Sequence, residues 1–156
     1  MMAVRNATAA DIPEIVRVTS AAYRVEDFFI NGDRTNAAEV AQKMAAPGSA
    51  FLVIDAPQGG LCASVFVEQR GDRGYFGMLS VDPAQQKQGH SRALIDAIEA
   101  HFRAAGCVAL DIDVVELREE LPAFYARLGF TRTGAAPFLN PHRTRDTQLI
   151  MMTKAL

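Results

Sequence analysis

The sequence has few cysteines, no excess of basic residues and no long apolar run, and each shortage excludes a class of protein. The two cysteines, Cys62 and Cys107, lie in apolar stretches, so we expect buried free thiols rather than a disulfide or a metal site. A net charge of −2 argues against a general nucleic-acid-binding surface. No stretch approaches the roughly 18 apolar residues of a membrane span, and the N-terminus lacks the basic and then apolar pattern of a signal peptide. We therefore expect a cytoplasmic protein that binds neither membranes nor nucleic acids.

The remaining composition is that of an ordinary globular protein. With 156 residues, of which 49% are hydrophobic and 22% charged, the chain is long enough for one domain with a substantial core. Hydrophobic periodicity, capping residues and glycine-rich turns predict a single domain over residues 1–156. The expected strands are 3–6, 50–54, 61–68, 75–81, 108–115, one starting at 130, and 147–153, and the expected helices are about 11–24, 36–47, 91–105 and 119–128.

The order of these segments predicts the fold class. Three strands between residues 50 and 81 are joined by short turns, which is typical of an antiparallel meander. The strand at 108–115 follows a crossover helix, so it should lie parallel to the strand at 75–81. The order β-α-α-β-β-β-α-β-α-β-β therefore indicates an α/β (α+β) protein, with a mixed, mostly antiparallel sheet of about seven strands flanked by four helices.

The stretch 78–94 is the most informative part of the sequence. An apolar strand stops at Asp82-Pro83, a polar loop with Gly89 near its end follows, and a helix begins directly after it. Free N–H groups and the positive end of the helix dipole make such a helix start a natural anion site. The loop lacks the Gly-Lys-Ser/Thr ending of a P-loop and the three spaced glycines of a Rossmann fingerprint. What remains is a backbone nest for a diphosphate, with charge added by Lys87 and Arg92, or else a plain strand-to-helix connection.

A second motif, Tyr125-Ala126-Arg127-Leu128-Gly129-Phe130, lies downstream. With Val81-Asp82-Pro83 followed by Gln86-Lys87-Gln88-Gly89-His90-Ser91, the chain resembles the GNAT superfamily of acyl-CoA-dependent N-acetyltransferases over nearly its whole length. That family carries Gln/Arg-x-x-Gly-x-Gly/Ala after a strand ending in Val-x-Pro, and a Tyr-x-x-Leu-Gly-Phe segment later. Three positions differ: Ser91 replaces the second Gly or Ala, His90 replaces an apolar residue, and Arg118 stands where many members have Asn. We expect His90 to be exposed or a weak phosphate contact rather than a catalyst.

The resemblance implies roles for individual residues. Tyr125 would protonate the departing CoA thiolate, a task that suits a phenol because it is neutral at pH 7 and can donate a proton. Arg127 would contact the CoA phosphates. The main chain of Leu79, Ser80 and Val81 would face the acetyl carbonyl and pantetheine of acetyl-CoA. The pyrophosphate would be held by Gln86, Lys87, Gln88, Gly89, His90, Ser91 and Arg92.

The acceptor side is less determined by the sequence. Asp113 ends a strand beside the expected cleft and is the first candidate for the general base, with Glu68, Glu116 and Glu26 as the others. Phe28 and Phe29 either anchor their loop on the core or form a wall of the substrate pocket. Glu26 from the same loop could attract a cationic substrate, and His142 in the last loop is either a substrate contact or a surface histidine.

We therefore expect an N-acetyltransferase that transfers an acetyl group from acetyl-CoA to a primary amine by direct attack and needs no metal. The amine could belong to a small molecule or to a peptide, and the sequence does not identify it. GNAT relatives are often dimers, so a homodimer is possible. The alternatives are a non-catalytic acyl-CoA-binding sensor or scaffold and, less favoured, an ordinary nucleotide-phosphate site.

Overall fold

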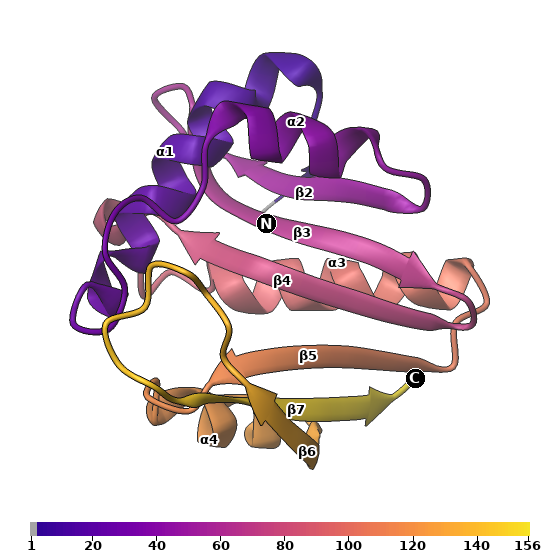
Figure 1. The fold of residues 1–156 in the computed structure, drawn as a ribbon. Helices are drawn as coiled ribbons and strands as arrows, with labels where there is room; N and C mark the ends of the chain where they lie inside the picture. The colour runs from indigo at the N-terminus through magenta and orange to yellow at the C-terminus, as the bar shows by residue number, and fades with distance from the viewer. Residues whose placement is uncertain (1–2) are drawn as a thin grey trace.

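A seven-stranded sheet forms the centre of the computed structural model, which describes residues 3–156 (Figure 1). The first two residues of the expected domain lie outside the described part. Neighbouring strands are antiparallel except for the parallel pair β4–β5, and the spatial order is β1-β2-β3-β4-β5-β7-β6. The mixed, mostly antiparallel fold class predicted from the sequence is confirmed. The strands are β1 (Val4–Asn6), β2 (Ser49–Asp55), β3 (Leu61–Arg70), β4 (Arg73–Val81), β5 (Ala109–Val115), β6 (Thr131–Pro137) and β7 (Gln148–Ala155).

Four helices cover the two faces of the sheet, with α1 and α2 on one face and α3 and α4 on the other (Figure 1). They are α1 (Ile12–Ala22), α2 (Ala37–Ala45), α3 (His90–Ala104) and α4 (Glu120–Arg127). Side-chain capping explains where the first two begin. Thr8 and Asp11 form a capping box before α1, and the Asn36 side chain accepts a hydrogen bond from Glu39 N at 2.9 Å before α2. Within residues 3–156, no helix is long and apolar enough to cross a bilayer.

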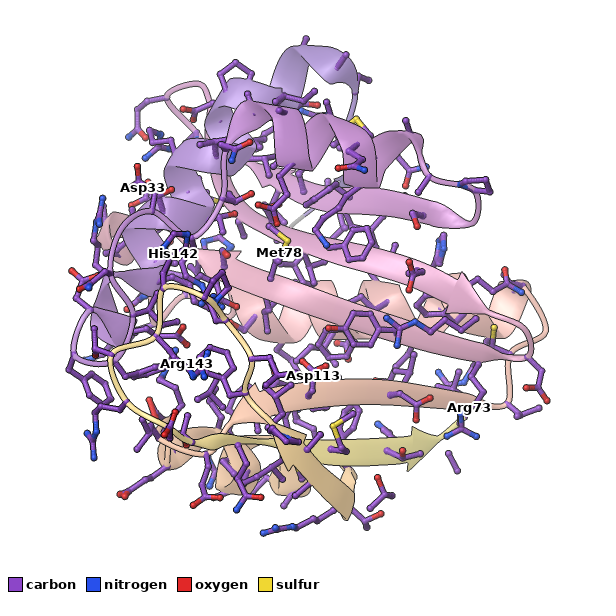
Figure 2. All side chains as sticks on the ribbon, viewed as in Figure 1. Asp33, Arg73, Met78, Asp113, His142 and Arg143 are labelled. Atoms are coloured by element: carbon purple, nitrogen blue, oxygen red, sulfur yellow. The ribbon has the colours of Figure 1, made fainter. Side chains whose placement is uncertain are left out.

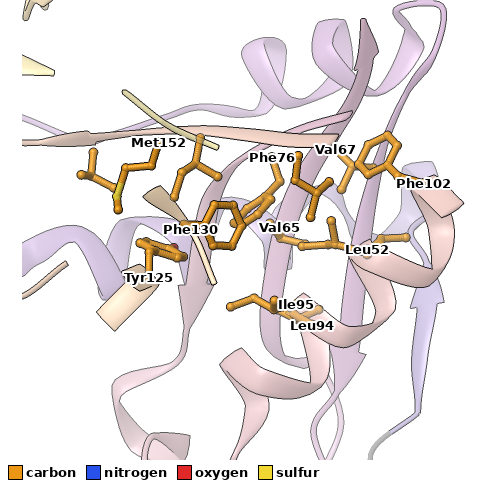
Figure 3. Packing of buried hydrophobic residues seen from close by; sticks show 14 of the residues in the cluster. Leu52, Val65, Val67, Phe76, Leu94, Ile95, Phe102, Tyr125, Phe130 and Met152 are labelled. Carbon is orange, nitrogen blue, oxygen red and sulfur yellow. The ribbon is translucent and has the colours of Figure 1, made fainter. Parts of the chain in front are cut away.

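The core is divided by the sheet into two apolar layers. On the α3 side, Leu94, Ile98 and Phe102 of α3 pack against strands β2 to β5, and Figure 3 shows Phe76, Phe130 and Tyr125 in the same cluster. On the α1 side, residues of α1 and α2 such as Val18 and Val40 pack on the opposite face. The central strand β3 is buried on both faces, which explains its unbroken apolar run. Cys62 and Cys107 are both buried and free, as the sequence predicted.

The parallel pair β4–β5 is joined at one end and open at the other. Its ladder comprises Arg73–Tyr75 against Ala109–Asp111, and no pairing between the two strands follows in the described chain. Beyond Tyr75, β4 carries a bulge opposite β3, and Met78 takes a positive φ of 56°. A bulge bends a strand, so β4 turns away from β5 toward α1 (Figure 1). The functional site forms where the two strands separate.

Candidate active site

A cleft of about 910 Å³ opens where β4 and β5 diverge. Its volume falls in the range of small-molecule binding sites, about 300–1,000 Å³. The walls come from both sides of the sheet, so the cleft joins residues that are far apart in the sequence. Of the residues predicted to be functional, it is lined by Glu26, Leu79, Val81, Gln86, Lys87, Gly89, His90, Ser91, Arg92, Asp113, Tyr125 and Arg127.

The loop before α3 presents a row of free backbone donors. Asp82 starts the loop by accepting a hydrogen bond from Ala84 N at 3.0 Å, and positive φ values at Lys87 (64°) and Gly89 (82°) then turn the chain into the helix. Across the described chain, no protein acceptor bonds to the backbone N–H groups of residues 86–92. Free N–H groups at the start of a fifteen-residue helix fit a diphosphate. Of the other predicted loop contacts, Gln88 lies outside the cleft lining, and the buried Ser80 hydroxyl donates to Met78 O at 2.9 Å.

His90 does not have the exposed side chain that the sequence suggested. The ring is 8% exposed, and its Nδ1 lies 3.8 Å from Cys62 Sγ. The first position of α3 faces β3, so the imidazole packs beneath the loop instead of pointing to solvent. Of the two expectations for His90, the exposed side chain is wrong. The phosphate contact stays a prediction, and the group that His90 offers a diphosphate is its backbone N–H.

Tyr125 points from α4 into the core side of the cleft. Its ring packs against Phe76, Phe124 and Phe130, at centroid distances of 6.1, 5.1 and 5.6 Å (Figure 3). Burial raises the pKa of Tyr125 above its usual range, and the positive charge of Arg118 opposes this. The phenol is therefore protonated at neutral pH and is held in a fixed orientation by aromatic packing. It has the properties of a proton donor.

Asp113 is a half-buried carboxylate on β5 that also lines the cleft. Tyr75 Oη on β4 donates to Asp113 Oδ1 at 3.3 Å, across the gap where the strands separate. Burial raises the pKa of Asp113 above its usual range, opposed by the Tyr75 hydrogen bond and by the charge of Arg70. Figure 2 shows Asp113 on β5, beside the gap. A desolvated carboxylate with a raised pKa suits proton transfer or the binding of an ammonium group.

Glu26 enters the cleft as the centre of an ion-pair network. Its Oε2 accepts a hydrogen bond from Arg118 Nη1 at 2.9 Å, and its Oε1 lies 3.5 Å from Arg34 Nη1. The Glu26 side chain is 4% exposed. Because two guanidinium groups compensate its charge, Glu26 is suited to holding the walls of the cleft together. Of the other base candidates, Glu68 pairs with Arg70 and Glu116 is exposed, and both lie outside the cleft lining.

The structure also brings in residues that the sequence reasoning did not single out. The chain has three tyrosines, and Tyr23 and Tyr75 line the cleft together with Tyr125. Burial raises the pKa of Tyr23 to about 12. Arg34 and Asn140 line the cleft from two loops, at residues 27–36 and 138–147. Tyr23 lies on the buried face expected for the first helix, but nothing in the sequence distinguishes it from a core residue.

Phe28, Phe29 and His142, each predicted as either a substrate contact or a structural or surface residue, lie outside the cleft lining. Phe29 is fully buried against Phe138 and neighbouring apolar residues, whereas Phe28 is 52% exposed and packs on the edge of Phe29. His142 is exposed, and its carbonyl accepts a hydrogen bond from Asn31 N at 2.9 Å. Phe29 and His142 therefore help to hold two loops together, and Phe28 covers Phe29. The inner surface of those loops is formed instead by Glu26, Arg34, Phe138 and Asn140.

Comparison with known proteins relates the chain to one protein family. Residues 47–132 match the model of the acetyltransferase (GNAT) domain family. A mycothiol acetyltransferase of Propionibacterium freudenreichii is 38% identical over 78 residues, which are 47% of this chain. That alignment covers 25% of the relative, so the chain spans only part of that protein's length.

Solved structures share the fold. The ribosomal-protein-S18-alanine N-acetyltransferase from Escherichia coli matches 99% of this chain and 94% of its own at a TM-score of 0.83 and 18% identity. A GNAT phosphinothricin acetyltransferase from Sinorhizobium meliloti, in complex with AcCoA, matches 99% of this chain and 88% of its own at 0.79 and 16%. The family model covers more than half of the chain, and it does so over the β4 strand, the free N–H groups and Tyr125. The chain therefore belongs to the GNAT acetyltransferase family.

Proposed function

We propose that this protein is an N-acetyltransferase that transfers the acetyl group of acetyl-CoA to a primary amine. The observation that carries the proposal is the convergence of three features in one cleft. These are an anion-binding helix start, a buried neutral phenol at Tyr125 and a carboxylate of raised pKa at Asp113. Each is ordinary alone, and together they match the chemistry of acyl transfer from a phosphate-bearing donor.

The residues around the α3 end of the cleft fit coenzyme A. The free N–H groups of residues 86–92 would hold its diphosphate, and Lys87, Arg92 and Arg127 line the same end with positive charge. Beyond Tyr75, β4 has no partner strand on its β5 side, which leaves the main chain at residues 79–81 available to the pantetheine. Bound there, acetyl-CoA supplies a thioester whose carbonyl carbon an amine can attack.

The side chains divide the proton transfers between them. Asp113 takes one proton from the acceptor ammonium, directly or through water, which frees the nitrogen lone pair. The nitrogen then forms a bond to the thioester carbonyl carbon as the carbon–sulfur bond breaks. Tyr125 Oη donates its proton to the leaving thiolate, and the second proton lost by the nitrogen returns through water to Tyr125. The products are an amide, free CoA and one released proton.

The test is Tyr125→Phe, which removes the hydroxyl and keeps the ring packing. We expect turnover to fall by about 100-fold, because general acid catalysis contributes on the order of 10²–10⁴. CoA affinity, measured by calorimetry, should stay close to that of the wild type. Thiol release from acetyl-CoA with a panel of amines measures turnover. Unchanged turnover would remove Tyr125 from the acid role, and CoA binding without thiol release for any amine would indicate a sensor or scaffold.

A further inference from the structure

Two loops close the acceptor end of the cleft by pairing with each other. Residues 27–36 follow the turn after α1, and residues 138–147 join β6 to β7; we call the pair the strap. Ile30 and Arg143 form an antiparallel bridge, flanked by the hydrogen bonds Asn31 N to His142 O at 2.9 Å and Thr144 N to Phe29 O at 2.8 Å. Figure 1 shows the yellow loop between β6 and β7 crossing in front of the gap between β4 and β5. The strap gives the two loops one shared inner surface.

Arg34 is a cation on that surface whose guanidinium lacks hydrogen-bond acceptors among the described residues. Its side chain is 24% exposed, and its guanidinium makes no hydrogen bond to any acceptor within residues 3–156. Its nearest carboxylate is Glu26 at 3.5 Å, which already accepts a shorter bond from Arg118. Tyr23 lies beneath the guanidinium, 5.0 Å from it. A largely desolvated guanidinium normally finds carboxylate or phosphate oxygens for its five donors.

Asn140 adds donors from the other loop of the strap. Its Oδ1 accepts a hydrogen bond from His142 N at 2.8 Å, an assignment that leaves the amide NH₂ group facing outward from that turn. In the described chain, nothing accepts a hydrogen bond from this NH₂ group, and Asn140 lines the cleft. Arg34 and Asn140, one from each loop of the strap, therefore both present donors in the cleft lining that have no hydrogen-bond acceptor within residues 3–156.

The β5 side of the cleft has the complementary chemistry. Asp113 offers a carboxylate whose hydrogen-bond partner is the Tyr75 hydroxyl. Of the other charged groups at this end, Glu26 is compensated by two arginines, and Glu39 and Lys43 on α2 are half-exposed and of opposite sign. The acceptor end is thus bipolar, with a carboxylate that can accept a proton on β5 and, on the strap, donors that have no hydrogen-bond acceptor in the part of the chain that the structure describes.

We infer that the acceptor is a small amine that also carries an oxyanion, with Arg34 and Asn140 binding the oxyanion while Asp113 receives the ammonium. This inference rests on the proposed acetyl transfer. A carboxylate or a phosphate would satisfy the same donors, because both present oxygen pairs that match a guanidinium fork. An amine without an oxyanion would leave those donors desolvated and unpaired, which weakens its binding.

Matched pairs of amines test the inference directly. The carboxylate arm compares 3-aminopropanoate with ethylamine, lysine with 1,5-diaminopentane and tyrosine with tyramine, and the phosphate arm compares 2-aminoethyl phosphate with ethanolamine. We expect kcat/KM to be at least about tenfold higher for the oxyanion-bearing member of the pairs that are accepted. The arm with the larger ratio identifies the oxyanion. Equal or lower values for the oxyanion-bearing members would overturn the inference.

Arg34→Met assigns the effect to the guanidinium, since it keeps an apolar stem over Tyr23. We expect KM for the preferred acceptor to rise about tenfold or more, with kcat and the KM of its oxyanion-free partner nearly unchanged. Arg24→Met is the matched control, because Arg24 is 56% exposed, pairs with Asp33 and lies outside the cleft lining. An equal rise in KM for both members of a pair would assign Arg34 a merely structural role and contradict the inference.

A binding measurement separates the two proposals. Calorimetry with the preferred amine on the CoA-bound protein should show binding to the wild type and a loss of at least about tenfold in Arg34→Met. Binding with this pattern but without thiol release would refute the proposed transfer and support the oxyanion site. Thiol release without any preference for oxyanions would support the transfer and refute the oxyanion site.

Discussion

Burial raises the pKa of both Tyr125 and Asp113, and the consequence for each residue is different. A phenol of raised pKa remains a proton donor at neutral pH, whereas a carboxylate of raised pKa gains affinity for a proton. A single physical cause, burial in the cleft, thus suits Tyr125 to donate a proton and Asp113 to accept one in the proposed reaction. This separation of roles is what proton transfer on the two sides of one reacting centre requires.

Asp113→Asn tests the proposed role of the Asp113 carboxylate as the general base. We expect kcat/KM to fall by about 100-fold, in line with the loss of a general base. In the wild type, activity should increase as the pH rises through the raised pKa of Asp113, because the ionised form accepts the proton. The pH–rate profile of the variant should lose that acidic limb.

Asp111→Asn is the matched control for Asp113→Asn. Asp111 lies two residues earlier on β5, is bonded to Arg73 at 2.7 Å and to Thr153 at 2.6 Å, and does not line the cleft. The Asp111→Asn variant should retain activity.

Stability gives a second comparison. Since the folded-state pKa of Asp113 is raised, its protonated form favours folding, and this contribution is lost as the pH rises through that pKa. Asp113→Asn should therefore be at least as stable as the wild type at pH 7, and an equal loss of activity in both variants would contradict the role of Asp113.

The candidate residues that the sequence could identify are those that are recognised from their neighbours along the chain. Tyr125 belongs to a continuous motif, and Asp113 ends a recognisable strand. The contact between Tyr75 and Asp113 depends on the register of the parallel pair, in which Tyr75 lies opposite Asp111. Arg34 and Asn140 come to the same cleft from the two loops of the strap, whose pairing spans more than a hundred residues of sequence. Neither relationship leaves a pattern in one sequence.

At the scale of elements, the start of α3 combines two properties in one turn. The loop must adopt left-handed backbone conformations at Lys87 and Gly89, and it must leave its N–H groups without internal partners. Both properties cost stability, since positive φ is strained for most residues and unpaired polar groups are costly to bury. Because the loop is exposed, solvent can bond to its free N–H groups, and this limits the cost of leaving them without internal partners.

Gly89→Glu should abolish most of the CoA affinity. The side chain adds strain at a φ of 82° and places a negative charge where the diphosphate would bind. We expect Kd for CoA, measured by calorimetry, to rise by at least about tenfold, which corresponds to about 1.4 kcal/mol. Gly106→Glu is the matched control, because Gly106 follows the other end of the same helix at a φ of 81° with open space around it. Similar CoA binding in the two variants would refute the assignment of the loop.

The boundaries of most elements could be predicted because caps and turns are local. Asn36 with Glu39 and the glycine-rich turns between β2, β3 and β4 place those elements to within a few residues. The error at His90 has a different origin. A residue at the first position of a helix precedes any periodicity, so the direction of its side chain is set by the strand beneath it. Such contacts depend on tertiary packing, which the hydrophobic pattern of α3 does not contain.

At the scale of the whole molecule, the cleft separates two halves that are joined at both of its ends. One half contains β1 to β4 with α1 and α2, and the other contains β5 to β7 with α4. The short ladder between Arg73–Tyr75 and Ala109–Asp111 joins them at one end, and the strap and the Glu26–Arg118 ion pair join them at the other. Cross-links at both ends keep the two halves, and hence the β4 and β5 walls of the cleft, at a fixed separation.

The Glu26–Arg118 pair should therefore couple the two halves energetically, and a double-mutant cycle with Glu26→Gln and Arg118→Met measures this. We expect a coupling free energy of about 1–2 kcal/mol from urea unfolding, because both side chains are largely buried, at 4% and 17% exposed. The control cycle uses Arg24 and Asp33, a pair of similar length at 2.8 Å whose side chains are 56% and 67% exposed. Solvent screening should reduce that coupling to less than about 0.5 kcal/mol. If the two cycles gave equal values, the ion pair would contribute no more than a surface contact, and the halves would be held together by the strap, the ladder and the apolar cluster beneath α3.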